Sequence, residues 1–333
     1  MIMRRWLIWI PAFLLLGGCA SFHKTKPLDF LSKERVSKPQ YARYVSVTRS
    51  LPPFVNVNIK LPVNVKLHTG CRTSEVILSG DAHDIPRIGT TVRKQTLYVT
   101  LGSLKPHMTK KKIVYGPVEI DICMSTIHQF IYRGKGRVVG QNITSNAMEV
   151  MLNNSGSTRF EGQINLRKLT IVGAGYTEIN GIQSDYLAVY LHGRPKVQLT
   201  GVANMDIVAL GAPKMSFYWL KAPLFKLRAK GGGGIIQMGG IADRLDVELD
   251  GNIRFDGRYI RAKETFVKTH GHAIAYISTA LYQHTLAMDA SDIYYYTLPL
   301  TNSNFMAKNG AVLDMRSWEL QLEQPFSSYN KSS

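Results

Sequence analysis

The first residue of this 333-residue chain that could do chemistry is a cysteine close to the amino terminus. Cys19 follows Leu16-Gly17-Gly18, and small residues before a cysteine give a processing enzyme access to the backbone. Its thiol can then carry a diacylglycerol. Several acyl chains on one residue, at about 0.8 kcal/mol per buried methylene, make a durable anchor. The pattern predicts a covalent lipid on Cys19 and no other cofactor.

The segment before Cys19 supports this prediction. Arg4 and Arg5 are followed by an apolar run, 6–16, that is too short to span a bilayer, which takes roughly 20 residues. We therefore predict a signal peptide over residues 1–18. Its end resembles the lipobox of bacterial lipoproteins, although an ordinary secretory signal that happens to contain a cysteine is the alternative. By resemblance to the sorting rules of Gram-negative lipoproteins, Ala20 in place of Asp favours the outer membrane and its periplasmic face over the cell surface.

Two further cysteines, Cys71 and Cys123, remain in the mature chain. An even pair in an oxidising compartment can form a disulfide. Two separate buried thiols are the other possibility, because spacing alone reveals no geometry. The sequence leaves both open.

One acidic cluster could serve a polysaccharide-cleaving enzyme, because such enzymes use grouped carboxylates beside basic residues. It consists of Asp243, Asp246, Glu248, Asp250 and Asp256, with Arg244, Arg254 and Arg258 nearby. Three of its members alternate with apolar residues and so share the outer face of one strand. We interpret the cluster as a solvated face with ion pairs and expect no catalytic residues.

Histidines offer a second candidate for chemistry. His270 and His272 flank Gly271, and His284 follows, so a metal site would need all three to converge. We predict no metal site. The run 231–234 contains four glycines but lacks the Lys-Ser/Thr of a phosphate-binding loop, and is better explained as a turn.

Two exposed sets could contact a partner. They are the tyrosines Tyr294, Tyr295 and Tyr296 and the lysines Lys110, Lys111 and Lys112. Consecutive residues of a strand point to opposite sides, so either Tyr295 or both of its neighbours must face outward. A role in capping the end of the fold is the alternative for the tyrosines.

The net charge of the chain indicates acidic partners. Its formal value is +18, and it falls to +16 when the signal peptide, with Arg4 and Arg5, is removed. For an anchored envelope protein, the expected partners are the membrane, other envelope proteins and acidic surface polymers, and nucleic acid is not expected.

The elements that position these residues are strands. Residues 55–59 and 63–67 alternate apolar and polar side chains, and we expect 54–70 to form an opening hairpin. The predicted organisation is a signal peptide at 1–18, a lipidated basic tether at 19–49, an N-terminal β region at 50–125, solenoid repeats at 126–318 and a tail at 319–333.

A repeat of about 18–20 residues runs through the second half, in the order strand, glycine turn, second strand, second glycine. Its first turns are marked by Gly134, Asn154, Gly173, Gly193, Gly211, Gly231, Gly251, Gly271, Asp289 and Asn309. Stacked coils bury apolar side chains along one axis, which a lone pair of strands cannot do. We predict an all-β fold, a parallel β-helix or β-solenoid, with an antiparallel sandwich or propeller as the alternative.

The segments 54–70, 76–81 and 94–100, followed by the glycine-turn repeats, resemble the bacterial envelope family named putative auto-transporter adhesin, head GIN domain. The resemblance covers roughly Val45 to the C-terminus. It implies a right-handed β-solenoid on an exported or lipid-anchored chain, and adhesion only loosely. The basic composition and the segment Lys105–Lys112 depart from it.

We therefore expect a non-catalytic, lipid-anchored envelope protein whose rigid solenoid surface serves binding or assembly. One alternative is an accessory subunit of an envelope-spanning complex such as a secretion system. The other is an enzyme acting on polysaccharide.

Overall fold

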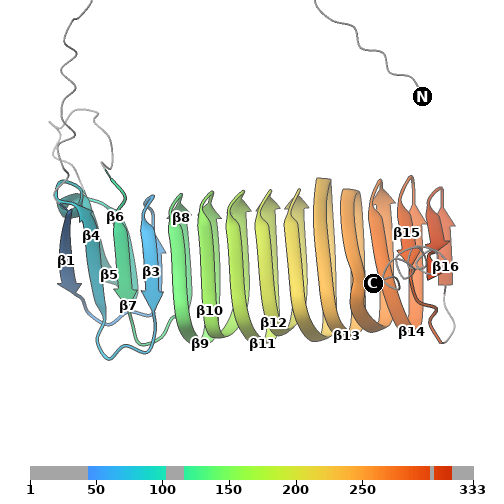
Figure 1. Ribbon diagram of the computed structural model, residues 1–333, viewed down its shortest axis with the longest axis horizontal. Coiled ribbons are helices and arrows are strands. Elements are labelled where there is room, and N and C mark those ends of the chain that lie inside the picture. Colours follow the sequence, from blue (N-terminus) through green and yellow to red (C-terminus); the bar gives the residue numbers. More distant parts are fainter. Residues whose placement is uncertain (1–43, 103–115, 301–303, 317–333) are drawn as a thin grey trace, which may run out of the picture. The chain divides into compact units, whose positions relative to one another are not determined.

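The computed structural model describes residues 44–102, 116–300 and 304–316. Within these ranges the chain is nearly all β and winds into a β-solenoid of about nine turns, whose coils lie side by side in Figure 1. The predicted fold class is thereby confirmed. None of the described segments forms a helix long and apolar enough to cross a bilayer.

The N-terminal part consists of eight strands and one short helix. They are β1 (Tyr44–Ser50), β2 (Asn56–Ile59), β3 (Asn64–His68), β4 (Glu75–Asp81), the 3-10 helix η1 (Ile85–Arg87), β5 (Ile88–Arg93), β6 (Thr96–Leu101), β7 (Glu119–Cys123) and β8 (Gln129–Gly134). The repeat part consists of longer strands that bend around the coils. They are β9 (Arg137–Asn154), β10 (Ser157–Gly173), β11 (Tyr176–Gly193), β12 (Lys196–Gly211), β13 (Lys214–Gly271), β14 (Ile274–Met288), β15 (Asp292–Tyr295), β16 (Asn304–Lys308) and β17 (Ala311–Asp314).

Neighbouring coils of the repeat part pair in parallel, one period apart. Ser157 pairs with Tyr176, Tyr176 with Lys196, and Lys196 with Lys214, so partners lie 18 to 20 positions apart. The predicted repeat length is confirmed, and each period is one turn of the solenoid.

The core runs along the axis of the coils. In β11, Leu187, Val189 and Leu191 are buried, whereas the residues between them face outward. Val189 lies between Leu169 of β10 and Ile207 of β12, so like side chains stack from coil to coil. This alternation explains why branched and aromatic residues occupy every second position.

The first turns of successive coils lie in one row, as the positions of the glycines predicted. Gly173, Gly193 and Gly211 stack in register with positive φ angles of 113°, 96° and 109°. A Cβ atom on Gly193 would lie 2.7 Å from the carbonyl oxygen of Gly173. Asp289 and Asn309 continue the predicted row with φ angles of 60° and 64°. Glycine, Asp and Asn are the residues that best tolerate this conformation.

The expected hairpin over 54–70 is wrong. The two strands β2 and β3 do not pair with each other. Instead, β2 pairs in parallel with β6 and β8, and β3 with β7 and β9. Leu61 and Val63, between the strands, are buried at 5% and 1% exposure, so this segment bends around the core and β2 and β3 form one coil.

The tether predicted to end at residue 49 is too long. Residues 44–50 form β1, which pairs antiparallel with β4 from Tyr44–Asp81 to Ser50–Glu75. The Arg49 guanidinium donates hydrogen bonds to the carbonyl oxygens of Ile88 (2.7 Å) and Ile85 (3.3 Å). Most residues of β1 are exposed, so the sequence of this strand lacks the apolar alternation that marks a half-buried one.

Candidate binding surfaces on the outer face of the solenoid

The solenoid displays its outward side chains in rows. Each row takes one residue from every coil, and neighbours in a row are separated by the strand spacing of about 4.8 Å. Residues some twenty positions apart in sequence therefore become surface neighbours. The candidate sites lie on such rows.

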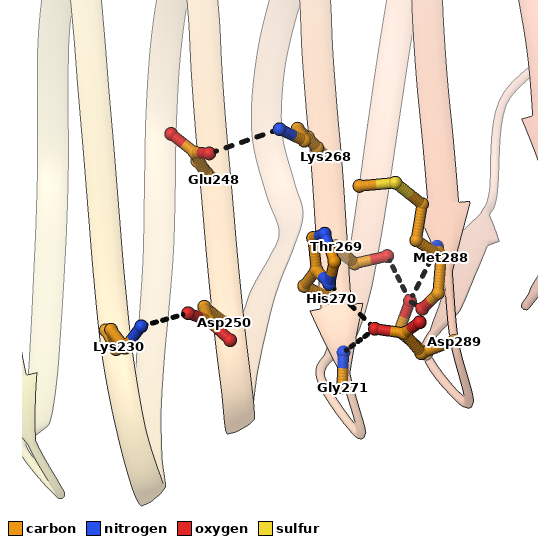
Figure 2. A network of polar contacts seen from close by, with 10 residues as sticks. Lys230, Glu248, Asp250, Lys268, Thr269, His270, Gly271, Met288 and Asp289 are labelled. Atoms are coloured by element: carbon orange, nitrogen blue, oxygen red, sulfur yellow. Dashed lines mark hydrogen bonds and ion pairs between the residues drawn. The ribbon is translucent and has the colours of Figure 1, made fainter.

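Most members of the predicted acidic cluster are paired with basic residues. Asp250 forms an ion pair with Lys230, and Glu248 with Lys268 (Figure 2). The carboxylates lie 2.7 Å and 3.5 Å from the respective Nζ atoms. Asp246 accepts a 2.8 Å hydrogen bond from Arg244 Nε. The hydrogen bond from Lys230 lowers the pKa of Asp250 below its ordinary value, although burial opposes the shift.

The other two carboxylates of the acidic cluster, those of Asp243 and Asp256, are also paired with basic side chains. Asp243 lies 2.7 Å from Lys263 Nζ. Asp256 accepts two hydrogen bonds from the Arg258 guanidinium, at 2.9 and 2.8 Å. Burial raises the pKa of Asp256, but the bonds from Arg258 outweigh it, and the net shift is downward. A carboxyl group with a lowered pKa is a poor general acid near neutral pH, so the ion-pair interpretation describes this geometry best.

A shallow groove of about 580 Å³ crosses the same rows. Phe266 lines the groove, with the Arg244 guanidinium 4.2 Å and the stacked His284 ring 4.9 Å from the Phe266 ring centroid. Leu286 and Met306 extend the apolar part of the groove. Phe266 was not identified from the sequence. Charged and aromatic residues on different coils are recognised as neighbours only when positions one repeat length apart are compared residue by residue.

The three candidate histidines do not converge. His270 Nδ1 lies 2.7 Å from Asp289 Oδ2, which also accepts a hydrogen bond from the Gly271 amide (Figure 2). His284 lies in the groove against Phe266. Across the described ranges, no group of three or more His, Cys, Asp or Glu side chains is arranged to hold a metal ion.

The late tyrosines form a stack along the solenoid. Tyr294 stacks on Tyr276 with ring centroids 5.2 Å apart, and the Arg258 guanidinium lies 5.3 Å from the Tyr276 ring centroid. Tyr295 packs against the core and stacks on Phe305 of β16 at 5.1 Å. The rings of Tyr276, Tyr294 and Tyr295 therefore have neighbours on their faces, which favours the capping interpretation over a contact surface.

Cys71 and Cys123 are joined by a disulfide, with Cα atoms 5.9 Å apart. Cys123 ends β7 and pairs in register with His68 of β3, three residues before Cys71. The bond therefore connects two adjacent coils at the N-terminal end of the solenoid. Of the two possibilities that the sequence left open, a disulfide and two separate thiols, the structure shows the disulfide.

Several predicted features lie outside the described residues. They are the lipidation residue Cys19, the signal peptide at 1–18, the tether up to residue 43, the lysines Lys110, Lys111 and Lys112, and the tail at 319–333.

Comparison with solved structures finds several to which this chain is similar. Three similar crystal structures are a putative lipid binding protein from Parabacteroides distasonis, a putative adhesin from Bacteroides fragilis and a putative adhesin from P. distasonis. Their sequence identities are 12%, 13% and 11%, and their TM-scores 0.48, 0.34 and 0.40. The alignments cover 81%, 82% and 82% of this chain and 96%, 96% and 98% of the respective structures.

No protein of curated function matches the chain significantly. The model of one family, described as putative auto-transporter adhesin, head GIN domain, matches residues 53–218. These residues run from the segment before β2 into the first coil of β13 and include the repeat turns from Gly134 to Gly211. Through residues 53–218, this chain is a member of the putative auto-transporter adhesin, head GIN domain family.

Proposed function

We propose that this protein is a lipid-anchored component of the bacterial envelope that acts by binding a partner and not by catalysis. The observation that carries the proposal is the arrangement of outward side chains in rows on stacked coils. Such rows hold many contact residues at fixed spacing on a rigid scaffold, which lowers the entropic cost of binding an extended partner. The family name, which refers to an adhesin, is consistent with this role.

The ion pairs of the acidic cluster support binding over catalysis. An enzyme that hydrolyses a glycosidic bond with a pair of carboxyl groups uses one with a raised pKa as its acid. Here the pKa values of Asp250 and Asp256 are lowered by Lys230 and Arg258. The same fixed charges are suited to orienting a charged partner on the surface.

The lipid anchor is tested by the fate of Cys19. In the native bacterium, the wild-type protein should incorporate labelled palmitate and sediment with outer membranes, and Cys19→Ser should do neither. Ala20→Ser is the matched control, because it changes the next residue and keeps the acyl acceptor. If Cys19→Ser stayed in the membrane fraction, the anchor would be refuted.

The mode of action is tested by purification of the full chain from detergent-solubilised membranes. Recovery of the protein with a substoichiometric envelope polymer or protein supports a binding role. Recovery in a large assembly of fixed stoichiometry would instead make it a structural subunit. Cleavage of an acidic polysaccharide by the wild-type protein, abolished by changing Asp246, Asp250 and Arg258 together, would refute the non-catalytic proposal.

A further inference from the structure

Two neighbouring coils of the solenoid, 192–230, have a strong excess of positive charge. From His192 to Lys230 the chain contains seven basic residues and a single acidic one, Asp206. The basic residues are Arg194, Lys196, Lys214, Lys221, Lys226, Arg228 and Lys230. Asp206 is paired with Arg228 at 3.3 Å, and Lys230 is paired with Asp250 of a later coil. The excess is therefore local, because the following coils carry enough carboxylates to pair their own basic residues.

Three of these basic residues lie together where one coil turns into the next. Lys196 pairs in register with Lys214, so their backbones are about 4.8 Å apart on adjacent coils. Arg194 precedes Lys196 in the same turn, and its amide donates a hydrogen bond to the carbonyl oxygen of Gly173. All three side chains are exposed, and within the described part of the chain none of them forms an ion pair.

The backbone fixes this corner and keeps it open. Pro195 and Pro213 are buried within the two turns and restrict φ there. On the next coil the corresponding turn is the glycine run 231–234. A Cβ atom added to Gly232 or Gly233 would have no neighbour within 4 Å, so the space around these two glycines is free of protein atoms. After this turn, the Ile235 amide donates a hydrogen bond to the carbonyl oxygen of Pro213, which places Ile235 beside Lys214 on the next coil.

An aromatic residue continues the row of lysines. Tyr176 pairs in register with Lys196, and the residue is 38% exposed. Its hydroxyl group is hydrogen-bonded to Glu178 (3.1 Å) and lies 3.3 Å from Gln198, so the ring has a defined position. A fixed aromatic ring beside cations combines an apolar contact for a sugar ring with charges for its acidic substituents.

The positions of Lys196 and Lys214, opposite each other on adjacent coils, favour the binding of an anion. Like charges placed directly opposite each other on neighbouring strands destabilise a sheet. In the acidic cluster, opposite charges such as Lys230 and Asp250 relieve this repulsion, whereas no carboxylate of the described residues forms an ion pair with Lys196 or Lys214. A bound polyanion would supply it. Its charges would have to follow one another along the solenoid axis at the coil spacing, which is comparable with the length of one sugar ring.

We propose that Tyr176, Arg194, Lys196 and Lys214, here called the basic row, bind a linear acidic polysaccharide that runs along the solenoid axis. The proposal rests on the proposed binding function and identifies the chemistry of the partner. A narrow line of charges at a corner matches a linear polymer better than a flat membrane surface, which would meet a broad basic face.

The test uses the full lipidated chain in detergent, with polygalacturonate as the probe and neutral dextran as the reference polymer. Arg194→Gln, Lys196→Gln and Lys214→Gln together should weaken the affinity for polygalacturonate by about tenfold or more. The control variant combines Lys60→Gln, Arg72→Gln and Lys94→Gln, three exposed basic residues of the N-terminal part. It removes the same net charge and should change the affinity by less than about twofold. Tyr176→Ala should also weaken binding, whereas Tyr176→Phe should do so less.

Three results would overturn the proposal. The first is an equal loss of affinity in the two triple variants, which would show that the affinity depends only on the net charge of the protein. The second is binding to phosphatidylglycerol vesicles, but not to polygalacturonate, through the same residues. The third is no binding of polygalacturonate by the wild-type protein. None of them affects the membrane fractionation of the Cys19 variants or the co-purification of partners, so the proposed function would be judged separately.

Discussion

Cys71 and Cys123 show how two residues separated by 52 positions act together at the N-terminal end of the solenoid. The bond links the segment that follows β3 to the end of β7, and β3 and β7 already pair in parallel. It therefore closes a long loop of chain around a contact that hydrogen bonds also make. In the chain-entropy account, such a loop restricts the unfolded state and so stabilises the folded one.

We predict that Cys71→Ser combined with Cys123→Ser lowers the free energy of unfolding by about 4 kcal/mol, the chain-entropy value for a loop of this length. Denaturant midpoints measured with and without reducing agent provide the check. The wild-type midpoint should fall on reduction, and that of the double variant should not move. An unchanged midpoint in wild-type protein whose thiols are shown to be free would contradict the prediction.

At the scale of the element, the turn between two coils decides which residues are tolerated. The glycine run 231–234 contains both kinds of position. A Cβ atom on Gly231 would lie 1.9 Å from the carbonyl oxygen of Gly211, whereas one on Gly232 would have no neighbour within 4 Å. Adjacent glycines in the same turn therefore differ in function: one permits close stacking of coils, and the other leaves open space.

We predict that Gly231→Ala destabilises the protein by roughly 1–3 kcal/mol, because either the coil spacing or the backbone must shift. Gly232→Ala should stay within about 0.5 kcal/mol of the wild type and is the matched control. Thermal melts of the two variants, followed by circular dichroism, decide the matter. Equal melting temperatures would contradict the prediction, because they would show that the turn accommodates a Cβ atom at position 231 without loss of stability.

At the scale of the whole molecule, the formal charge of +18 makes stability sensitive to acid. Among the described residues, five aspartates have pKa values below the ordinary range, each with a basic side chain among the causes: Asp81, Asp250, Asp256, Asp289 and Asp314. For Asp314, the hydrogen bond from Arg316 lowers the pKa to about 2. Since these pKa values are lower in the folded state, the ion pairs contribute stability above the unfolded pKa of about 3.9.

We predict that this contribution is lost as the pH falls from about 4 through the folded-state pKa values, toward pH 2 for Asp314. Protonation also raises the positive charge further, which adds repulsion. Melting temperatures measured between pH 5 and pH 2 should fall for the wild-type protein. The fall should be smaller for Asp314→Asn, whose side chain cannot titrate. A larger fall for this variant than for the wild type would contradict the assignment.

The sequence by itself determined the repeating part of the fold. Apolar alternation and a glycine, Asp or Asn every 18 to 20 residues were enough to define coils, because each coil meets only its neighbours and the same local requirement recurs in each one. The turn residues Gly173, Gly193, Gly211, Asp289 and Asn309 all adopt the positive φ angles that their types favour. The in-and-out alternation placed the acidic cluster on the outer face for the same reason.

Only the tertiary structure decided the N-terminal end and the content of the surface rows. There β2 lies between β6 and β8, which come later in the chain, so the order along the axis departs from the order in sequence. The exposed strand β1 and the contact of Phe266 with His284 likewise depend on partners distant in sequence. The register of Lys196 opposite Lys214 is of the same kind. Local patterns predict which way a side chain points, whereas its neighbour on the next coil depends on how many residues the intervening turns contain.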